Sequence, residues 1–339
     1  MSASETTASI PARPEVRVRT FEVSPAAAAA VIAVMTLMFA VAALLLRSRS
    51  PIDRYEIGVV TRHLGMTILI ATRSPAPVLM IALILERWLP VSARQRDLTR
   101  GFYQDLGWYA VDYIRQLTWI PLLFALLFAV KHSLLGSRDL IPAGAMPAPI
   151  LWIVGILAGD VLAYWSHRLR HRFDILWNFH SIHHSQRELN FFTQNRFHDV
   201  DTAIDLVIRM LPLVILHASW TAIGVYAAIS LAHFRLYHSK IRSNYGMLRY
   251  LLVTPQSHRI HHARDTQKLN CNFGSFFSIW DRAFGTQYPR SDEYPQELGI
   301  KDEGFPIEQD APLRDLPRIL AAQMLYPFRK MLDRDAANR

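Results

Sequence analysis

The chain has 339 residues, enough for one large domain or two ordinary ones. It is 51% hydrophobic with a mean hydropathy of +0.12, so apolar runs that span a bilayer explain its composition better than a large soluble core does. The net charge is +9, and many arginines lie beside apolar runs, which is typical of cytoplasmic loops and lipid headgroup contacts rather than of nucleic-acid binding. The single cysteine, Cys271, excludes an intrachain disulfide and a thiolate metal site.

The N-terminal part of the chain predicts a tail followed by membrane spans. Residues 1–23 are polar and contain prolines, which is typical of a disordered tail. The apolar run Ala26–Leu46 is long enough to cross a bilayer and too long for the apolar region of a cleaved signal peptide. Met66–Leu89 is interrupted by an Arg-Ser-Pro sequence, which predicts a kinked or re-entrant span, and Trp108–Val130 predicts the next span.

The following apolar runs predict a topology that gathers the histidines on one side. Ile150–Trp165 returns through the membrane and leads directly into a histidine-rich stretch. Ala203–Ala232 is long enough for a hairpin of two short helices that re-enters from the side it left. Because residues 94–100 are rich in arginine, we expect that side to be cytoplasmic. Pro317–Leu332 predicts an amphipathic helix that lies on the membrane or packs against the soluble part.

Eight of the fourteen histidines fall into three short clusters. Each cluster contains histidines three or four residues apart. On a helix, side chains at this spacing lie on the same face. Neutral imidazole is a good ligand for Fe, Zn, Cu and Ni. Eight imidazoles exceed what one tetrahedral ion needs, and the sequence therefore predicts a dinuclear site. The clusters are His167 and His171; His180, His183 and His184; and His258, His261 and His262.

These clusters occur inside a longer pattern between Gly159 and Tyr288. Its parts are Gly159-Asp160, Tyr164-Trp165, Leu176-Trp177-Asn178-Phe179-His180, Arg196-Phe197-His198, His238-Ser239-Lys240, Thr254-Pro255 and Trp280-Asp281-Arg282-Ala283-Phe284-Gly285-Thr286, together with the clusters. The pattern resembles the fatty acid hydroxylase/sterol desaturase superfamily of integral-membrane, non-haem di-iron oxygenases. The resemblance implies an all-α fold: an integral-membrane helical bundle whose cytosolic, histidine-rich helical cap holds the dinuclear metal site.

The resemblance also implies which residues bind metal. All eight cluster histidines match metal-binding positions of the family, and we expect them to be the ligands and the catalytic residues. His238 matches a further histidine between the second and third clusters, and is the predicted ninth ligand. His233 resembles another ligand position, although Tyr237 stands where the hydroxylase branch often carries a histidine.

Three polar residues are candidates for supporting roles. His198 either supports a ligand or has a structural role. Asp160 lies seven residues before His167, so it could accept a hydrogen bond from a ligand imidazole, or pair with an arginine such as Arg115. Asn272 orients a ligand or caps a turn.

The activity implied by the resemblance is O2-dependent hydroxylation or desaturation of a C–H bond in a membrane lipid. O2 is the co-substrate and two Fe ions form the metal centre. The sequence contains no flavin, nicotinamide or haem motif, so electrons would come from an external NAD(P)H-dependent reductase through a ferredoxin or cytochrome b5-like carrier. Sterol, fatty acyl, carotenoid and ether lipids all stay open as substrates.

The expected organisation has four parts. Residues 1–23 form the tail, 24–149 an N-terminal transmembrane region, 150–290 the catalytic domain with its transmembrane hairpin, and 291–339 a C-terminal tail with the amphipathic helix. The expected location is a multi-pass position in a bacterial cytoplasmic membrane, with the histidines facing the cytoplasm.

Two other functions remain open from the sequence. A membrane cytochrome is suggested by the thirteen-residue spacing of His167 and His180, but Arg168, Arg170 and Asp174 lie between them and argue against burial in lipid. A membrane protein that binds zinc without redox chemistry, as a structural element or a transporter, is the second.

Overall fold

The computed structural model describes residues 76–92, 98–135, 147–216, 218, 220–290, 292–295, 297–302, 304–306 and 313–337. The predicted tail at 1–23, the predicted span Ala26–Leu46, the first part of Met66–Leu89 and most of the arginine-rich loop lie outside these residues.

The described residues are all helical apart from turns, loops and three isolated β-bridges. The α-helices are α3 (Ala76–Trp88), α4 (Arg100–Leu117), α5 (Trp119–Leu135), α6 (Ala148–Arg172), α7 (Asp174–His184), α8 (Asp199–Ile215), α9 (Trp220–His238), α10 (Pro255–His261), α11 (Thr266–Leu269), α12 (Ile279–Ala283) and α13 (Leu316–Ala337). Three 3₁₀ helices, η1 (Thr193–Asn195), η2 (Gly246–Tyr250) and η3 (Leu313–Asp315), complete them. The expected all-α fold is confirmed for this part of the chain.

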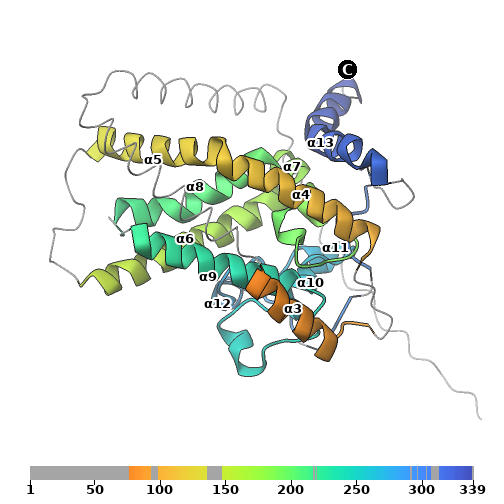
Figure 1. The fold of residues 1–339 in the computed structure, drawn as a ribbon, viewed down its shortest axis with the longest axis horizontal. Coiled ribbons are helices and arrows are strands. Elements are labelled where there is room, and N and C mark those ends of the chain that lie inside the picture. Colours follow the sequence, from red (N-terminus) through yellow and green to blue (C-terminus); the bar gives the residue numbers. More distant parts are fainter. Residues whose placement is uncertain are drawn as a thin grey trace, which may run out of the picture.

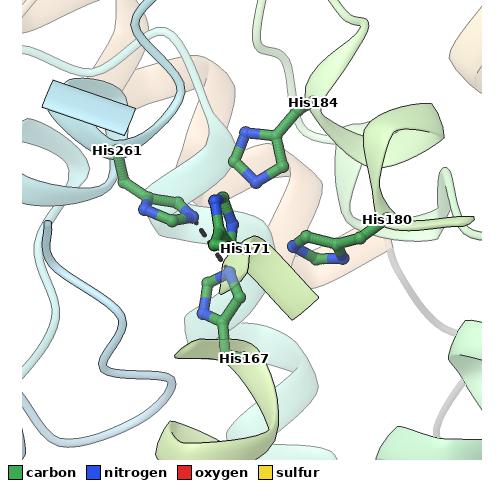
Figure 2. Close-up of side chains that lie close together, drawn as sticks. All are labelled: His167, His171, His180, His184 and His261. Carbon is green, nitrogen blue, oxygen red and sulfur yellow. Dashed lines mark hydrogen bonds between the residues drawn. The ribbon is translucent and has the colours of Figure 1, made fainter. Parts of the chain in front are cut away.

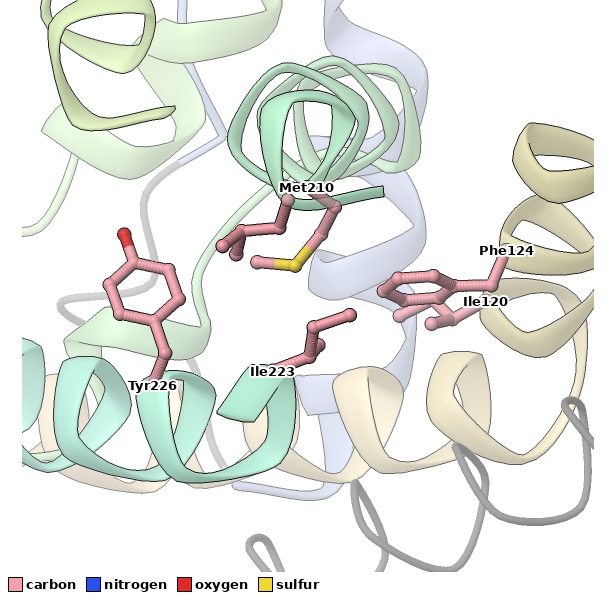
Figure 3. Close-up of a cluster of buried hydrophobic side chains, with 6 residues drawn as sticks. Ile120, Phe124, Met210, Ile223 and Tyr226 are labelled. Atoms are coloured by element: carbon pink, nitrogen blue, oxygen red, sulfur yellow. The ribbon is translucent and has the colours of Figure 1, made fainter. Parts of the chain in front are cut away.

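The long helices α5, α6, α8 and α9 run beside one another, and the shorter α10, α11 and α12 gather at one end of them (Figure 1). Helix α8 packs on both α5 and α6, and α10 packs on α9. A core of buried side chains lies where α5, α8 and α9 meet (Figure 3). Its members are Ile120, Phe124, Met210, Leu213, Ile223 and Tyr226. Burying such side chains stabilises the bundle by roughly 1.5–3 kcal/mol each.

The predicted membrane spans are only partly reproduced. Among the described residues one helix, Pro149–Arg172, is long and apolar enough to cross a membrane. The predicted span Trp108–Val130 is instead two helices, α4 and α5, with a break at Thr118 and a bend of 44° between them. They are long and apolar enough to cross a membrane only if the pair is taken as one broken span. Helices α8 and α9 cover the region Ala203–Ala232 of the predicted hairpin, but neither meets that criterion alone.

Helix α13 packs on α4 and α7. The indole Nε1 of Trp108 donates a 3.0 Å hydrogen bond to Oε1 of Gln323, and both side chains are fully buried. Of the two interpretations of the predicted amphipathic helix, packing against the rest of the protein is therefore the one observed.

The turn before α10 is specified locally. Thr254 and Ser257 form a capping box in which each side chain binds the other's backbone N–H, and Pro255 occupies the first turn. A proline there loses no helical hydrogen bond, because that N–H has no partner within the helix. The helix therefore starts at Pro255, which sets the direction of the third histidine cluster.

Candidate metal centre

The three histidine clusters lie on three helices that converge. Helix α6 ends with the first cluster, and α7 follows after the single extended residue Phe173 and carries the second. Helix α10 carries the third cluster, with His262 as its C-terminal cap. Nε2 of His261 lies 2.9 Å from Nε2 of His167, and Nε2 of His262 lies beside that of His258, whose neighbour His238 is 3.3 Å from His183, so all three clusters reach the same buried region.

The histidines form two groups in which the ligand nitrogens all lie within 4.8 Å of one another. The first group has five members, drawn in Figure 2: His167, His171, His180, His184 and His261. The second group has four: His183, His238, His258 and His262. Nine of the ten predicted ligands are thus brought together.

Hydrogen bonds to backbone carbonyls fix which nitrogens of the first group face inward. Nδ1 of His167 lies 2.9 Å from the carbonyl oxygen of Phe273, and Nδ1 of His261 lies 2.8 Å from that of Cys271. Because a carbonyl can only accept, each Nδ1 carries the proton and each Nε2 presents a lone pair. Two lone pairs cannot bond to each other, yet these Nε2 atoms are 2.9 Å apart (Figure 2).

A shared metal ion accounts for such a short contact. Two imidazole nitrogens about 2.0–2.1 Å from one ion lie about 3 Å apart when their bonds to it are perpendicular. The second group shows the same separations between Nε2 atoms: 3.3 Å for His183 and His238, 2.8 Å for His238 and His258, and 3.0 Å for His258 and His262. The residues therefore fit two metal ions, one per group.

Unpaired buried nitrogens point the same way. Both ring nitrogens of His171 and of His184 are buried without a hydrogen-bond partner, as is Nε2 of His180. Leaving a buried polar atom unpaired costs about 1–3 kcal/mol. A bound metal ion would supply the missing partner of the nitrogens that face it.

The imidazoles are held in their neutral form. Burial and then the neighbouring imidazoles lower the pKa values of His184 and His262 well below 6.5. Burial lowers the pKa of His261 to about 4. At neutral pH these rings therefore keep their lone pairs for a metal ion.

His233 lies outside both groups. It is five residues before His238 on α9, which places it about 140° around the helix from that residue. Its ring contacts those of Tyr237 and Phe276, with centroids 5.2 and 4.8 Å away. The structure does not bring His233 to the other predicted ligands.

Asp160 does not bind a ligand imidazole; it pairs with an arginine, as the other sequence hypothesis expects, but with Arg209 rather than Arg115. Its carboxylate accepts hydrogen bonds from the backbone N–H groups of Phe276 and Phe277 and from Nε1 of Trp280, at 3.0, 3.0 and 2.8 Å. Its nearest arginine is Arg209, at 3.8 Å. Asp160 thus anchors the loop that presents the carbonyl of Phe273.

His198 and Asn272 both have structural roles. Nδ1 of His198 accepts the backbone N–H of Val200 and caps α8. The Oδ1 atom of Asn272 accepts the backbone N–H of Tyr288, and its amide donates to the carbonyl of Ser257, while its φ of 56° closes a turn. Neither side chain contacts a histidine of the two groups through these bonds.

Asp201 supports a ligand and was not found from the sequence. Its carboxylate accepts a 2.8 Å hydrogen bond from Nδ1 of His180 and forms a 2.8 Å ion pair with Arg170. This bond orients the ring and leaves Nε2 of His180 facing its group. The only sequence signal was a carboxylate three residues after the Arg-Phe-His motif, in what reads as an ordinary helix start.

Two groups of converging neutral imidazoles in a helical bundle fit a dinuclear metal site. Residues 152–286 match the model of the fatty acid hydroxylase family.

Several curated proteins are similar to the same part of the chain. The alkylglycerol monooxygenase of Danio rerio is 33% identical over 42% of this chain and 31% of that protein. The ornithine lipid hydroxylase OlsE of Rhizobium tropici is 30% identical over 44% of this chain and 45% of that protein. The very-long-chain aldehyde decarbonylase GL1-6 of Oryza sativa is 25% identical over 67% of this chain and 38% of that protein. The chain thus spans less than half the length of these relatives, and no solved structure matches it significantly.

Proposed function

We propose that the protein is an O2-dependent di-iron oxidoreductase that hydroxylates or desaturates a C–H bond of a membrane lipid. The observation that carries this proposal is the pair of all-imidazole groups, which contain neither thiolate nor carboxylate. The named activities of the relatives, on alkylglycerols and on ornithine lipids, support a lipid substrate.

The nine grouped histidines are the proposed ligands, five for one iron and four for the other. Two iron ions held there would supply the redox chemistry that activates O2 for attack on a C–H bond. The protein's part is to orient the rings, through the carbonyls of Phe273 and Cys271 and the carboxylate of Asp201, and to keep them neutral.

A cavity beside the histidines supports an apolar substrate. A pocket of about 40 Å³ is lined by histidines of both groups, among them His180, His183 and His258. A larger cavity of about 220 Å³ lies between α5, α8 and α9, beside the core shown in Figure 3. Phe197, Asp205, Arg209 and Phe234 line both, so the two spaces adjoin.

The proposed location is a membrane, with the metal centre on the cytoplasmic side. Helix α6 is the candidate span that leads into the centre, and it exposes Ile150, Ile153 and Val154. Exposed apolar side chains on a long apolar helix are suited to lipid contact. An external NAD(P)H-dependent reductase with a ferredoxin or cytochrome b5-like carrier is the proposed source of electrons.

Metal analysis of protein purified anaerobically from iron-supplied cells tests the proposal. We expect about two irons per chain, antiferromagnetically coupled in the oxidised protein by Mössbauer spectroscopy. His183→Ala and His261→Ala each remove a ligand from one group and should lower the iron content. His233→Ala is the matched control and should leave it unchanged. Zinc that iron cannot replace would contradict an oxygenase and favour the non-redox alternative.

A further inference from the structure

The larger cavity is lined by buried polar atoms that make no hydrogen bond of normal geometry. Its lining includes Gln116, Asn195, Tyr226 and Ser230, and in each of them a side-chain oxygen is buried without a hydrogen-bond partner. Asn195, Tyr226 and Ser230 are 4%, 6% and 5% exposed. An apolar cavity with no polar function would not retain such atoms, because each costs about 1–3 kcal/mol when unpaired.

Two of these atoms must be acceptors. The amide nitrogens of Gln116 and Asn195 both donate to the same carboxylate oxygen of Asp112, each at 2.9 Å. Because a carboxylate only accepts, this contact fixes the orientation of both amides and leaves Oε1 of Gln116 and Oδ1 of Asn195 for another donor. The missing partner is therefore a group that carries an O–H or N–H.

The hydroxyls of Tyr226 and Ser230 complete the polar part of the cavity from the other side. They are four residues apart on α9 and so lie on one face of that helix. They also interact with each other, and Tyr226 with Arg209, although neither hydroxyl makes a hydrogen bond of normal geometry. A hydroxyl can donate or accept, so these two match the lone pairs of a ligand whose proton goes to the amide oxygens.

The charges around the cavity do not favour an anion. Arg209 is the one arginine in its described lining, and it forms a 2.6 Å ion pair with Asp205 and lies 3.8 Å from Asp160. A carboxylate or phosphate placed here would meet a cation that two carboxylates already neutralise, with Asp112 nearby as well.

The polar atoms lie between the histidines and the apolar part of the cavity. Along α9 the order is Ile223, Tyr226, Ser230, Phe234 and then the ligand His238. At 1.5 Å per residue, Ser230 lies roughly 10 Å along the axis from Ile223 and roughly 12 Å from His238. The polar side chains of α4, Asp112 and Gln116, likewise precede the apolar Ile120 and Phe124 of α5. Figure 3 shows the apolar end, where Met210 of α8 meets side chains of α5 and α9.

From this arrangement we infer that the substrate is an uncharged lipid with a hydroxyl group, bound with that group against Gln116, Asn195, Tyr226 and Ser230. Its hydrocarbon tail extends toward Ile120, Phe124 and Met210, away from the histidines. Oxidation then falls on the polar half of the molecule rather than at the end of the tail. This inference rests on the proposed function for the reaction but not for the binding.

Binding of three probes of equal chain length to the full, metal-loaded protein in detergent tests the inference. The probes are hexadecanol, its methyl ether, which lacks the donor, and the anion hexadecanoate. We expect hexadecanol to bind about 3–10-fold more tightly than the ether, the ratio that one net hydrogen bond gives. Hexadecanoate should bind more weakly than hexadecanol, and tighter binding of hexadecanoate would overturn the inference.

Substitutions in the cavity identify the groups responsible. Gln116→Met should weaken the binding of hexadecanol by a similar factor and leave the binding of the ether unchanged. Tyr226→Phe, which keeps the shape of the ring, should weaken both. Ile223→Val is the control and should affect the two probes equally. Equal losses of both probes in Gln116→Met, in a variant whose melting temperature is unchanged, would overturn the assignment of the donor site.

The reaction and the binding can fail separately. Protein that binds hexadecanol as expected but holds no iron and consumes no oxygen contradicts the proposed function alone. Protein that holds two irons and consumes oxygen, but prefers hexadecanoate, contradicts this inference alone.

Discussion

Single residues decide how the imidazoles are presented. The spacing of the histidines predicted that the rings within a cluster point in a common direction, because i, i+3 and i+4 positions share a helix face whatever the remaining fold. The partners of Asp160 and of His180 could not be predicted. Asp160 binds residues more than a hundred positions later, and the Asp201 partner of His180 depends on how α8 packs on α7. Local spacing carries no information on such contacts.

Asp201→Asn should lower iron affinity by about 10–100-fold, the usual effect of losing the partner of a ligand histidine. The amide lacks the charge that makes the imidazole a stronger donor to metal. Competition with a graded series of chelators measures the change. Asp199→Asn is the matched control, since the Asp199 carboxylate pairs with Arg115 instead of a histidine. Equal affinity in Asp201→Asn and the parent would show that the bond has no effect on the metal.

His198 should make the protein sensitive to mild acid. Burial lowers its pKa from 6.5 to about 4, and its neutral Nδ1 caps α8. Because the folded pKa is below the ordinary one, its contribution to stability is complete above pH 6.5 and is lost as the pH falls toward 4. The loss through this group is about 3 kcal/mol at most, from roughly 1.4 kcal/mol per pKa unit.

The matched variant is His198→Asn, because asparagine caps a helix equally well and does not titrate. Denaturant unfolding of both proteins between pH 4 and pH 7 measures the difference. The stability of the parent relative to the variant should fall as the pH falls, and a constant difference would refute the role of His198.

At the scale of helices, the composition predicted which parts of the chain are helical better than it predicted where each helix begins and ends. The apolar run Trp108–Val130 looked like one span, yet the helix breaks at Thr118, whose φ and ψ of −111° and −88° are not helical. Before the break, Gln104 and Asp105 of α4 are buried and bind Arg196 inside the protein, as residues in contact with lipid would not. Hydropathy averages over such residues and cannot locate the bend.

The contact between α6 and α8 depends on Gly159. A Cβ added there would lie 2.6 Å from the backbone carbonyl oxygen of Arg209, which cannot move alone. Gly159→Ala should therefore destabilise the protein by about 1–3 kcal/mol, as overpacking usually does. At Gly155 a Cβ would meet only the side-chain end of Leu213, so Gly155→Ala is the control and should cost less. Melting temperatures in the same detergent compare the two, and equal losses would contradict the close approach.

At the scale of the whole molecule, the histidine groups also connect helices that are distant in the sequence. Helices α6, α7, α9 and α10 each supply histidines to the two groups, so the proposed metal ions would tie together residues as far apart in the sequence as His167 and His261. The sequence predicted that the clusters meet, from the resemblance and from the expected topology. It could not predict that His183 joins the second group while its neighbour His184 joins the first. Adjacent residues point about 100° apart on a helix, but which group each one faces depends on how the helices pack.

Removal of the metal should therefore weaken the fold as well as end the activity. Ligands that bind only the folded state stabilise it, and nine neutral histidines without metal leave unpaired nitrogens behind. We expect chelation to lower the melting temperature of the parent, and readdition of iron to restore it. Chelation should lower the melting temperature of the His261→Ala variant by less than that of the His233→Ala variant, because His233→Ala keeps both histidine groups intact. An unchanged melting temperature after complete removal of iron would contradict this coupling.

The carbonyls that hold His167, His238 and His261 have a consequence for how this centre can evolve. Each of these rings gives its Nδ1 proton to a main-chain oxygen, of Phe273, Phe234 and Cys271 in turn. Every amino acid offers that same oxygen, so the tautomers of three ligands survive replacement of the residues that fix them. Changes at these positions therefore affect the tautomers only if they move the backbone itself. Phe234, which lines both cavities, can change its side chain and still offer the carbonyl that holds His238.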